Sequence, residues 1–383
     1  MSKKIERSYI REILDATNKE TISFAGGLPD ENLFPMDSLK KASSKVLEDT
    51  LCMQYSKSQG IDELREKIAN LYTKNLDFPT TKDEIMITTG SQQAFDIISK
   101  TFLEDEVLVQ TPTYIGALSA FKVLGLKVKG FNYIGSLNYE LKSSSGLYIM
   151  SDFANPNAKT LDNNHRDEFV HILNKKNSFL IEDGAYSLLD FEGKINKPIC
   201  ARYKKSFHLG SFSKIIAPGL RVGWIRADKN LLERILVSKE ALDLHTPTLN
   251  QMIINQFLED NDLFNHLKKI RSNYKDKMEF MSVCFEKYMP SFQFSKPEGG
   301  MFIYGSFEED SFLLAKEMLK KNIAFVPAEV FFHDNKKSKE ARFNFTNSSK
   351  EDIEKGIKEI SKTIIDKSES IWFKMFKERL PFL

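Results

Sequence analysis

A lysine that follows two serines and precedes an arginine is the part of this sequence best suited to covalent chemistry. Ser211 and Ser213 stand just before Lys214, and Arg221 comes seven residues after the lysine. A lysine amine can form a Schiff base with an aldehyde, and serine hydroxyls with an arginine fork can hold a phosphate. Pyridoxal 5′-phosphate (PLP) carries both groups on one molecule, so this segment indicates a site for that cofactor.

A second candidate phosphate contact lies at the start of a predicted helix. Gly90, Ser91 and Gln92 follow a predicted strand and open the helix. Free backbone amides and the positive end of the helix dipole would there face an anion. A glycine and a serine before a helix serve equally well as an ordinary cap, so both interpretations are open for this motif alone.

A carboxylate ends one of the predicted buried strands. Asp183 closes the apolar run 179–183, which places it at the carboxyl end of a strand, where open α/β sheets bind ligands. A carboxylate there can keep a pyridine nitrogen protonated and make the ring an electron sink. Tyr186, three residues later, can present its phenol to the ring oxygen. Taken alone, Asp183 is better explained as a cap of the following turn.

Three further side chains suit the other parts of a cofactor–substrate adduct. Tyr114 can lie flat over the ring, Asn155 can donate to the ring oxygen or a substrate carboxylate, and Arg342 can bind an α-carboxylate through two parallel hydrogen bonds. Considered one at a time, Tyr114 is explained as a core tyrosine, Asn155 as part of an Asn-Pro turn, and Arg342 as part of a surface salt bridge. Five motifs in one order, each beside a predicted strand, together indicate an amino-acid-processing PLP site.

Strands alternate with helices through the middle of the chain. The predicted helices cover 92–102, 115–124 and 166–175. The predicted strands are 85–89, 106–110, 127–131, 147–150, 179–183, 206–209 and 222–227. Strands separated by helices of this length predict an α/β fold with a mostly parallel sheet covered on both faces.

The last third of the chain predicts a smaller α+β unit. Residues 265–288 form the longest helical pattern, and helices are expected at 311–320 and 350–366. Strands are expected at 300–306, 324–326 and 341–346. The first 40 residues have loop chemistry and are expected to pack on this unit. We therefore predict a large domain over 41–290 and a small domain formed by 1–40 and 291–383.

The aromatic segment 370–383 is amphipathic. It is predicted to be a terminal helix packed on the small domain. A contact with a second subunit or another partner is the alternative.

Composition narrows the class of protein. A chain of 383 residues usually divides into two domains, and its net charge of +2 gives no electrostatic case for nucleic acid. Three widely spaced cysteines show no metal pattern and fit a reducing, cytoplasmic setting. The chain has neither an apolar run near the ~20 residues of a membrane span nor the apolar core of a signal peptide. We expect a cytoplasmic protein without a metal.

Several stretches resemble the class I/II aminotransferases, which are fold-type-I PLP enzymes, over about residues 23–347. The segments most similar to the subgroup acting on 2-aminoadipate, kynurenine, aromatic and branched-chain amino acids are 23–29, 54–56, 90–94, 245–251 and 297–302. The resemblance implies the PLP-dependent transferase (aspartate aminotransferase-like) fold, with the parallel sheet in the large domain.

The resemblance also implies a role for each candidate residue. Lys214 would form the Schiff base, Asp183 would hold the pyridine nitrogen, and Arg342 would bind the substrate carboxylate. Tyr186 and Asn155 would contact the ring oxygen, and Tyr114 would stack on the ring. The phosphate would be held by Ser91, Gln92, Ser211, Ser213 and Arg221.

The resemblance further implies contacts at the edges of the site. Tyr55 would reach the phosphate of a neighbouring subunit, which predicts a homodimer. The loop 26–29, with Gly27, would border the substrate side chain. Arg7 and Arg11 would border that pocket too, or else lie on a solvated helix face. Departures from the family pattern at Lys57, Asn157-Ala158 and Ala328 leave the amino acid open.

The expected activity is a ping-pong transfer of an amino group from an L-amino acid to a 2-oxo acid, with 2-oxoglutarate as the family's common acceptor. A PLP-dependent β-lyase or decarboxylase would use the same electron sink and is the first alternative. The second alternative is the ligand-sensing module of a transcription regulator. Such a regulator needs an N-terminal DNA-binding domain of ~60–70 residues, whereas the resemblance begins near Ser23.

Overall fold

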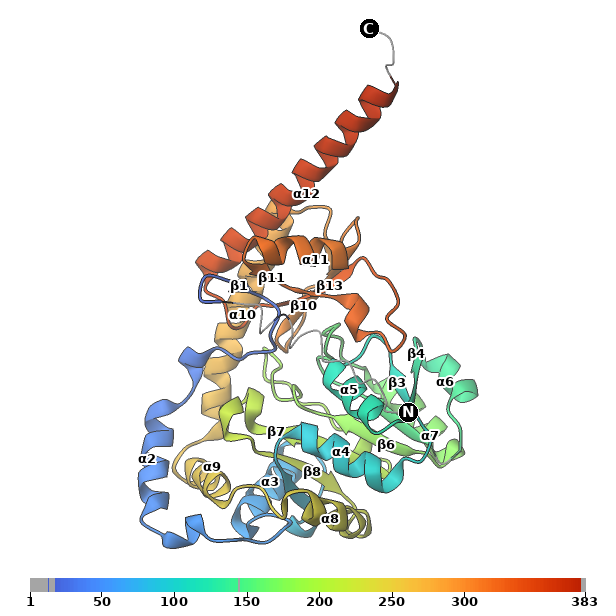
Figure 1. Cartoon of the computed structure of the whole chain (residues 1–383). Coiled ribbons are helices and arrows are strands. Elements are labelled where there is room, and N and C mark those ends of the chain that lie inside the picture. Colours follow the sequence, from blue (N-terminus) through green and yellow to red (C-terminus); the bar gives the residue numbers. More distant parts are fainter. Residues whose placement is uncertain (1–12, 14–17, 144, 380–383) are drawn as a thin grey trace.

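The computed structural model describes residues 13, 18–143 and 145–379 (Figure 1). A seven-stranded sheet holds the strands in the order β2-β8-β7-β6-β5-β3-β4. Their bounds are β2 (Ile85–Thr88), β3 (Glu106–Gln110), β4 (Lys127–Phe131), β5 (Gly146–Ile149), β6 (Phe179–Asp183), β7 (Ser206–Ser211) and β8 (Gly223–Ala227). β8 alone among these seven runs against its neighbours β2 and β7. The predicted α/β class with a mostly parallel sheet is therefore confirmed.

Apolar sequence in these strands reflects cover on both faces of the sheet. Every residue of β2, β5, β7 and β8 is buried, so neither face is open to solvent there. The helices that follow these strands are α4 (Ser91–Phe102), α5 (Ile115–Val123), α6 (Ile134–Glu140), α7 (Asn163–Lys176) and α8 (Lys229–Asp243). Parallel strands need such crossover helices, and the crossovers bring all the connecting loops to the same edge of the sheet.

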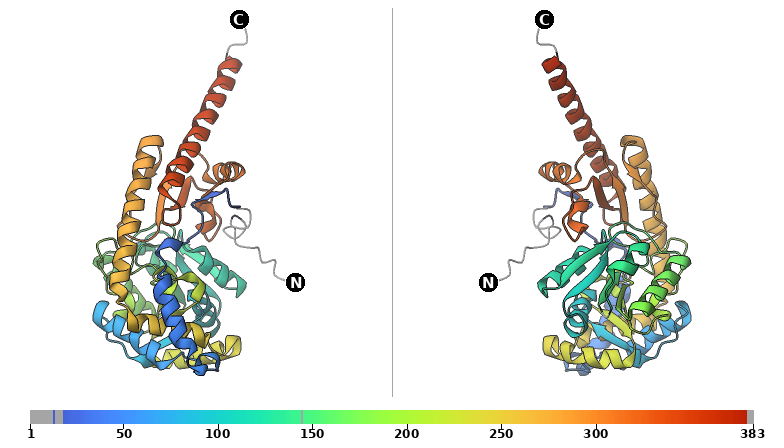
Figure 2. Two further views of the ribbon diagram at one scale, coloured as in Figure 1. Left: turned by 90° about the vertical axis from the view of Figure 1, so that its left-hand side faces the viewer. Right: turned by 90° about the vertical axis from the view of Figure 1, so that its right-hand side faces the viewer.

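Three more helices complete this part of the molecule and lead out of it. α2 (Met36–Leu47) and α3 (Asp62–Asn75) both pack on α9 (Thr248–Asp260). α10 (Leu263–Tyr288) then runs from the level of the large sheet to the level of the small sheets, where it packs against α12 (Lys350–Arg379) (Figure 2).

Two small sheets and α11 (Ser311–Lys320) form the second part. An antiparallel sheet has the order β12 (Val326–Pro327), β13 (Glu340–Asn344), β10 (Phe302–Ser306) and β9 (Gln293–Phe294). β1 (Ile22–Ser23) pairs in parallel with β11 (Ile323–Ala324), so this short N-terminal strand lies against a C-terminal element. Packed phenylalanine rings, including Phe285, Phe292 and Phe343, fill the core between α10 and this sheet.

The predicted elements differ from the observed ones in a few places. The strand expected at 324–326 is two strands, because the chain passes at Phe325 from the pair with β1 to the pair with β13. The strand expected at 341–346 is β13, which begins at Glu340 and ends at Asn344. α6 was not predicted, because seven residues with a glycine are too few for a helical pattern.

The C-terminal helix is longer than predicted. The helix expected at 350–366 continues to 379, but the side chains of 370–383 lie outside the described residues, as do Arg7 and Arg11. The division into domains 41–290 and 1–40 with 291–383 stays a prediction.

In the part of the chain that the structure describes, no helix combines the length and the apolar character of a membrane span, and no group of acidic, histidine or cysteine side chains suits a metal ion.

Candidate active site

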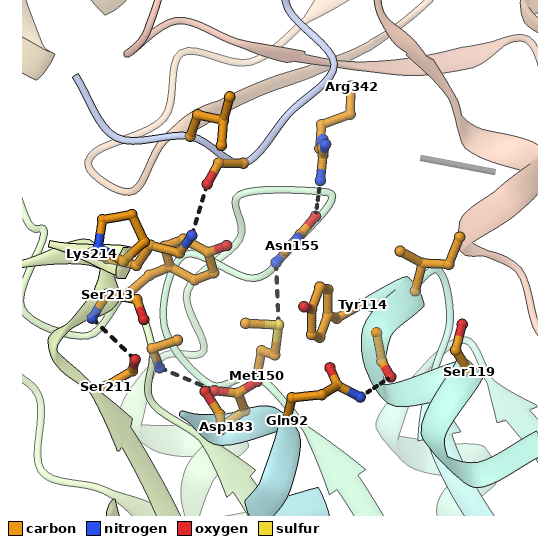
Figure 3. A pocket seen from close by; sticks show the side chains of 18 of the residues that line it. Gln92, Tyr114, Ser119, Met150, Asn155, Asp183, Ser211, Ser213, Lys214 and Arg342 are labelled. Carbon is orange, nitrogen blue, oxygen red and sulfur yellow. Dashed lines mark hydrogen bonds between the residues drawn. The ribbon is translucent and has the colours of Figure 1, made fainter. Parts of the chain in front are cut away.

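A cavity of about 600 Å³ lies at the carboxyl edge of the large sheet, and Arg342 of β13 borders it at the top of the view in Figure 3. Twelve of the thirteen predicted site residues line it. They are Gly27, Ser91, Gln92, Tyr114, Asn155, Asp183, Tyr186, Ser211, Ser213, Lys214, Arg221 and Arg342. Residues up to 315 positions apart in the sequence therefore meet in one place.

Lys214 points into the cavity from the short 3-10 helix η5 (Phe212–Lys214) that follows β7. The Ser211 hydroxyl caps this turn by accepting from the Ser213 amide at 3.1 Å, and the lysine Nζ donates to the Gly27 carbonyl at 2.7 Å. Burial, and then the charges of Arg342 and Arg221, lower the pKa of the Lys214 amine to about 8. A substantial fraction of this amine is therefore neutral near physiological pH and able to act as a nucleophile or a base.

Asp183 ends β6, and its carboxylate lies in the cavity wall. One oxygen accepts from the Tyr148 hydroxyl at 3.0 Å and the other from the Ala185 amide at 3.1 Å. Burial raises the pKa of this carboxyl to about 6, against the opposing effects of those hydrogen bonds and of Lys214. A buried carboxylate of this kind fits a protonated ring nitrogen, because the cation would relieve the cost of burying the charge.

Arg342 is a buried cation without a carboxylate partner among the described residues. It is 1% exposed and lies over the ring of Phe302, 4.2 Å from its centroid. Its Nη1 donates to the Asn155 side-chain oxygen at 2.7 Å and its Nη2 donates to the Ala25 carbonyl, while Nε has no partner within the described chain. Burial lowers the pKa of the guanidinium to about 10. An uncompensated buried charge is costly, so this arrangement fits an anionic ligand in the cavity.

The start of α4 and Arg221 together form an anion cradle on the opposite side of the cavity. Gly90, with φ 74°, leads into the helix, and a Cβ there would lie 2.7 Å from the Arg221 Nη2. Glycine therefore lets the guanidinium approach the free amides at the helix start, and Ser211 and Ser213 line the same cavity. A phosphate fits this set of donors.

Aromatic rings and an amide complete the wall. Tyr114 stands immediately before α5 and faces the cavity (Figure 3), and the centroid of its ring lies 6.3 Å from that of Phe95. Tyr186 is buried, and burial raises the pKa of its phenol. The Gln92 side chain donates to the Gly116 carbonyl at 3.1 Å and so braces the starts of α4 and α5 against each other.

Tyr55 is the predicted site residue that the structure does not bring to the cavity. Its side chain is 78% exposed and contacts the ring of His245 edge-on at 5.7 Å. A residue that acts on a second subunit would lie outside the cavity of its own chain in this way.

Sequence reasoning missed several residues of the site. Ile115, Ser119 and Met150 also line the cavity, whereas Leu28 lies there within the loop 26–29 that was expected to border it. The signal for Ile115 was its place next to the predicted site residue Tyr114 in the sequence. Nothing in the sequence marked Ser119 or Met150, since both lie in ordinary helix and strand patterns.

Known proteins resemble this chain in sequence and in fold. The sequence profile of the family described as aminotransferase class I and II matches residues 20–360. The chain belongs to this family. As an aminotransferase of PLP-dependent fold type I, it is 33% identical to aromatic-amino-acid aminotransferase 1 of Thermococcus litoralis, over 94% of this chain and 92% of that protein.

Two further relatives of the aminotransferase cover nearly its whole length. It is 31% identical to 2-aminoadipate transaminase of Thermus thermophilus, over 94% of both chains. The crystal structure of Pyrococcus horikoshii kynurenine aminotransferase in complex with PMP superposes with a TM-score of 0.88, at 30% identity, over 96% of this chain and 97% of that one. The predicted family and its aspartate aminotransferase-like fold are thus confirmed, and amino-acid substrates follow from them.

Proposed function

We propose that this aminotransferase holds PLP in the 600 Å³ cavity and moves an amino group from an L-amino acid to 2-oxoglutarate. The observation that carries the proposal is Lys214, a half-buried amine with a lowered pKa that shares the cavity with the buried carboxylate of Asp183 and with the guanidinium of Arg342, which has no carboxylate partner among the described residues. The complex of the related kynurenine aminotransferase with PMP supports the choice of cofactor.

Each polar group of the cavity has a distinct task in this proposal. When bound, PLP supplies an aldehyde that takes up the amino group and a cationic ring that accepts an electron pair. Asp183 would keep the ring nitrogen protonated, Tyr186 and Asn155 would donate to the ring oxygen, and Tyr114 would stack on the ring. The phosphate would be held by Ser91, Gln92, Ser211, Ser213 and Arg221.

Lys214 carries the proton transfer. Its Nζ would hold the aldehyde carbon of PLP until the amine of an arriving amino acid replaced it there, and the freed Lys214 amine would then accept the proton from the substrate Cα and release it again. With a pKa of about 8 the amine can accept this proton and release it again. Arg342 meanwhile fixes the substrate carboxylate, so the Cα–H bond is held toward the lysine.

The test of the proposed activity is an assay of amino donors with 2-oxoglutarate as acceptor. Phenylalanine, kynurenine and 2-aminoadipate form the first panel, because the relatives are named for aromatic amino acids, kynurenine and 2-aminoadipate. The holoenzyme is expected to absorb visible light, and a productive donor is expected to bleach that band until 2-oxoglutarate restores it. Release of ammonia and an oxo acid without any acceptor would instead indicate a lyase.

Replacing Arg342 with lysine is expected to lower kcat/KM for donor and acceptor alike by about 100-fold, mostly through KM. Lysine keeps the charge but loses one of two parallel hydrogen bonds to a carboxylate, and a charge-assisted bond contributes about 1.5–3 kcal/mol. Steady-state kinetics measure the change. Arg271→Lys is the matched control, since Arg271 is also largely buried and donates to a backbone carbonyl, but lies outside the cavity. An equal loss in both variants would contradict this role for Arg342.

We also propose that the aminotransferase works as a homodimer in which Tyr55 reaches the phosphate in the partner subunit. The proposal is supported by the neighbouring side chains, since Leu51 and Met53 are 64% and 68% exposed in the single chain. A second copy would cover these apolar groups. Sedimentation of the holoenzyme is expected to give twice the mass of one chain, and a fully active monomer would contradict the dimer.

A further inference from the structure

The carboxylate of Asp183 is held from behind by a tyrosine that does not line the cavity. Tyr148 lies on β5, is fully buried, and donates its hydroxyl to the Asp183 Oδ2 at 3.0 Å. The other carboxylate oxygen accepts from the Ala185 amide at 3.1 Å. Each oxygen therefore has one donor from the protein, and these two bonds together define the plane of the carboxylate.

The Tyr148 ring is fixed by aromatic neighbours on the helices that cover the sheet. It meets the ring of Phe95 on α4 edge-on at 5.5 Å and that of Phe121 on α5 edge-on at 5.8 Å. Both phenylalanines are completely buried. Because edge-to-face contacts of this kind are directional and the core is densely packed, the hydroxyl has little freedom to turn away from Asp183.

We propose that Tyr148 is a positioning residue for the reaction: its hydroxyl orients the Asp183 carboxylate so that the free lone pairs of both oxygens face the cavity. An ionised carboxylate offers about four acceptor sites, of which the protein occupies two here. The remaining sites are then available to the ring nitrogen. This inference rests on the proposed role of Asp183 and extends it to a residue that touches neither cofactor nor substrate.

The charges and hydrogen-bond donors around Asp183 predict the direction in which loss of the Tyr148 hydroxyl shifts the pKa of Asp183. Tyr148 faces it from β5, the Ala185 amide from the following loop, Lys214 from η5, and the phenol of Tyr186 lies nearby. Burial raises the pKa of Asp183, whereas the bonds from Ala185 and Tyr148 and the charge of Lys214 lower it. Loss of the Tyr148 hydroxyl removes one stabilising donor of the ionised form, so the pKa of Asp183 should rise.

The experiment compares Tyr148→Phe with a matched control. Tyr203→Phe also removes a buried hydroxyl, but that hydroxyl donates to the Ser178 carbonyl at 2.5 Å and lies outside the cavity. Two readouts do not depend on turnover: the pKa of Asp183 from carbon-13 NMR of the full-length, cofactor-free chain, and the Kd of PLP. The steady-state kcat and KM of the holoenzyme are measured beside them.

Tyr148→Phe is expected to raise the pKa of Asp183 from about 6 by about one unit. At about pH 5, below both values, the ionised fraction of Asp183 and with it the affinity for PLP should fall about tenfold, whereas near neutral pH the loss should be only about twofold. kcat should fall with KM for the donor nearly unchanged, because the carboxylate acts on the ring and not on substrate binding. Tyr203→Phe should change none of these values. An unchanged Asp183 pKa and PLP Kd in Tyr148→Phe, or equal changes in both variants, would overturn the proposal.

A second variant is expected to shift the pKa of Asp183 in the opposite direction, and it tests the proposal even if Tyr148→Phe does not fold. Difluorotyrosine placed at position 148 keeps the shape of the ring but makes the hydroxyl a stronger donor. The pKa of Asp183 should then fall, and a rise would overturn the proposal. If the wild-type enzyme transfers no amino group, the proposed function fails, whereas the NMR titration still tests the contact itself.

Discussion

Lys214→Ala is expected to lower kcat for amino transfer by about 10⁴-fold or more, while the protein still folds and still binds PLP through its phosphate. Removal of the amine takes away both the covalent anchor of the cofactor and the group that moves the Cα proton. A positioned acid–base group by itself contributes about 10²–10⁴-fold, and the covalent role adds to it. Single-turnover bleaching of the visible band and steady-state turnover measure the loss.

Lys214→Arg separates charge from proton transfer. The arginine keeps a cation beside Asp183, but its guanidinium stays protonated and can neither form the covalent link nor accept a proton. It should therefore be as inactive as the alanine variant. If positive charge were the main contribution of Lys214, the arginine variant would retain much of the activity.

Lys205→Ala is the matched control for Lys214→Ala. Burial also lowers the pKa of Lys205, but its Nζ lies over the ring of Phe179 and donates to the Asn177 carbonyl, far from the cavity lining. Its replacement should leave kcat unchanged. Normal turnover by Lys214→Ala would refute the proposed role of the lysine.

Much of the fold could be predicted because parallel strands have a simple sequence signature. The seven predicted strands of the large sheet are present with ends shifted by at most two residues. Strands covered on both faces are short apolar runs, and polar residues such as Asp183 mark their carboxyl ends. Since those ends meet at one edge, the site on the large sheet followed from the same pattern.

The parts that could not be predicted depend on contacts between distant segments. Tyr148 reads as one more apolar strand residue, and its bond to Asp183 exists because β5 and β6 are neighbours in a particular register. The change of sheet at Phe325 likewise depends on pairing with β1, some 300 residues earlier in the chain. The Nε of Arg342, which has no hydrogen-bond partner among the described residues, could not be predicted either, because partners from distant segments are known only once the chain is folded.

Asp183→Asn is expected to lower kcat by about 10³-fold, since an amide cannot stabilise the positive charge on the ring nitrogen, and a preorganised electrostatic group contributes about that much. The same change should make the cofactor-free protein more stable near neutral pH. Asparagine is nearly the same shape: its one oxygen can accept from the Ala185 amide while its amide group donates to the Tyr148 hydroxyl oxygen, and it carries no charge that must be buried.

The sign of the stability effect follows from the pKa of Asp183. Its pKa rises from 3.8 to about 6 in the folded chain, so between these values the folded state holds more protons than the unfolded state. Stability therefore falls as the pH rises through this window, by up to about 3 kcal/mol for a shift of this size. Asp183→Asn removes that loss, so its advantage should be present above about pH 6 and absent below pH 3.8.

Thermal unfolding of the cofactor-free chain at several pH values measures this advantage, and Asp243→Asn is the contrasting variant. Burial raises the pKa of Asp243, but the hydrogen bonds from Lys239 and Gln93 outweigh it and the net shift is downward. Its replacement should therefore destabilise the protein at neutral pH, because Lys239 would be left buried without its counter-ion. An Asp183→Asn protein that is no more stable at neutral pH than the wild type would contradict the buried charge at the centre of the proposed site. If Asp183→Asn gains stability and loses turnover, the ionised carboxylate of Asp183 lowers the stability of the cofactor-free protein but is needed for the reaction. This is expected of a carboxylate placed to meet a cation that arrives with the cofactor.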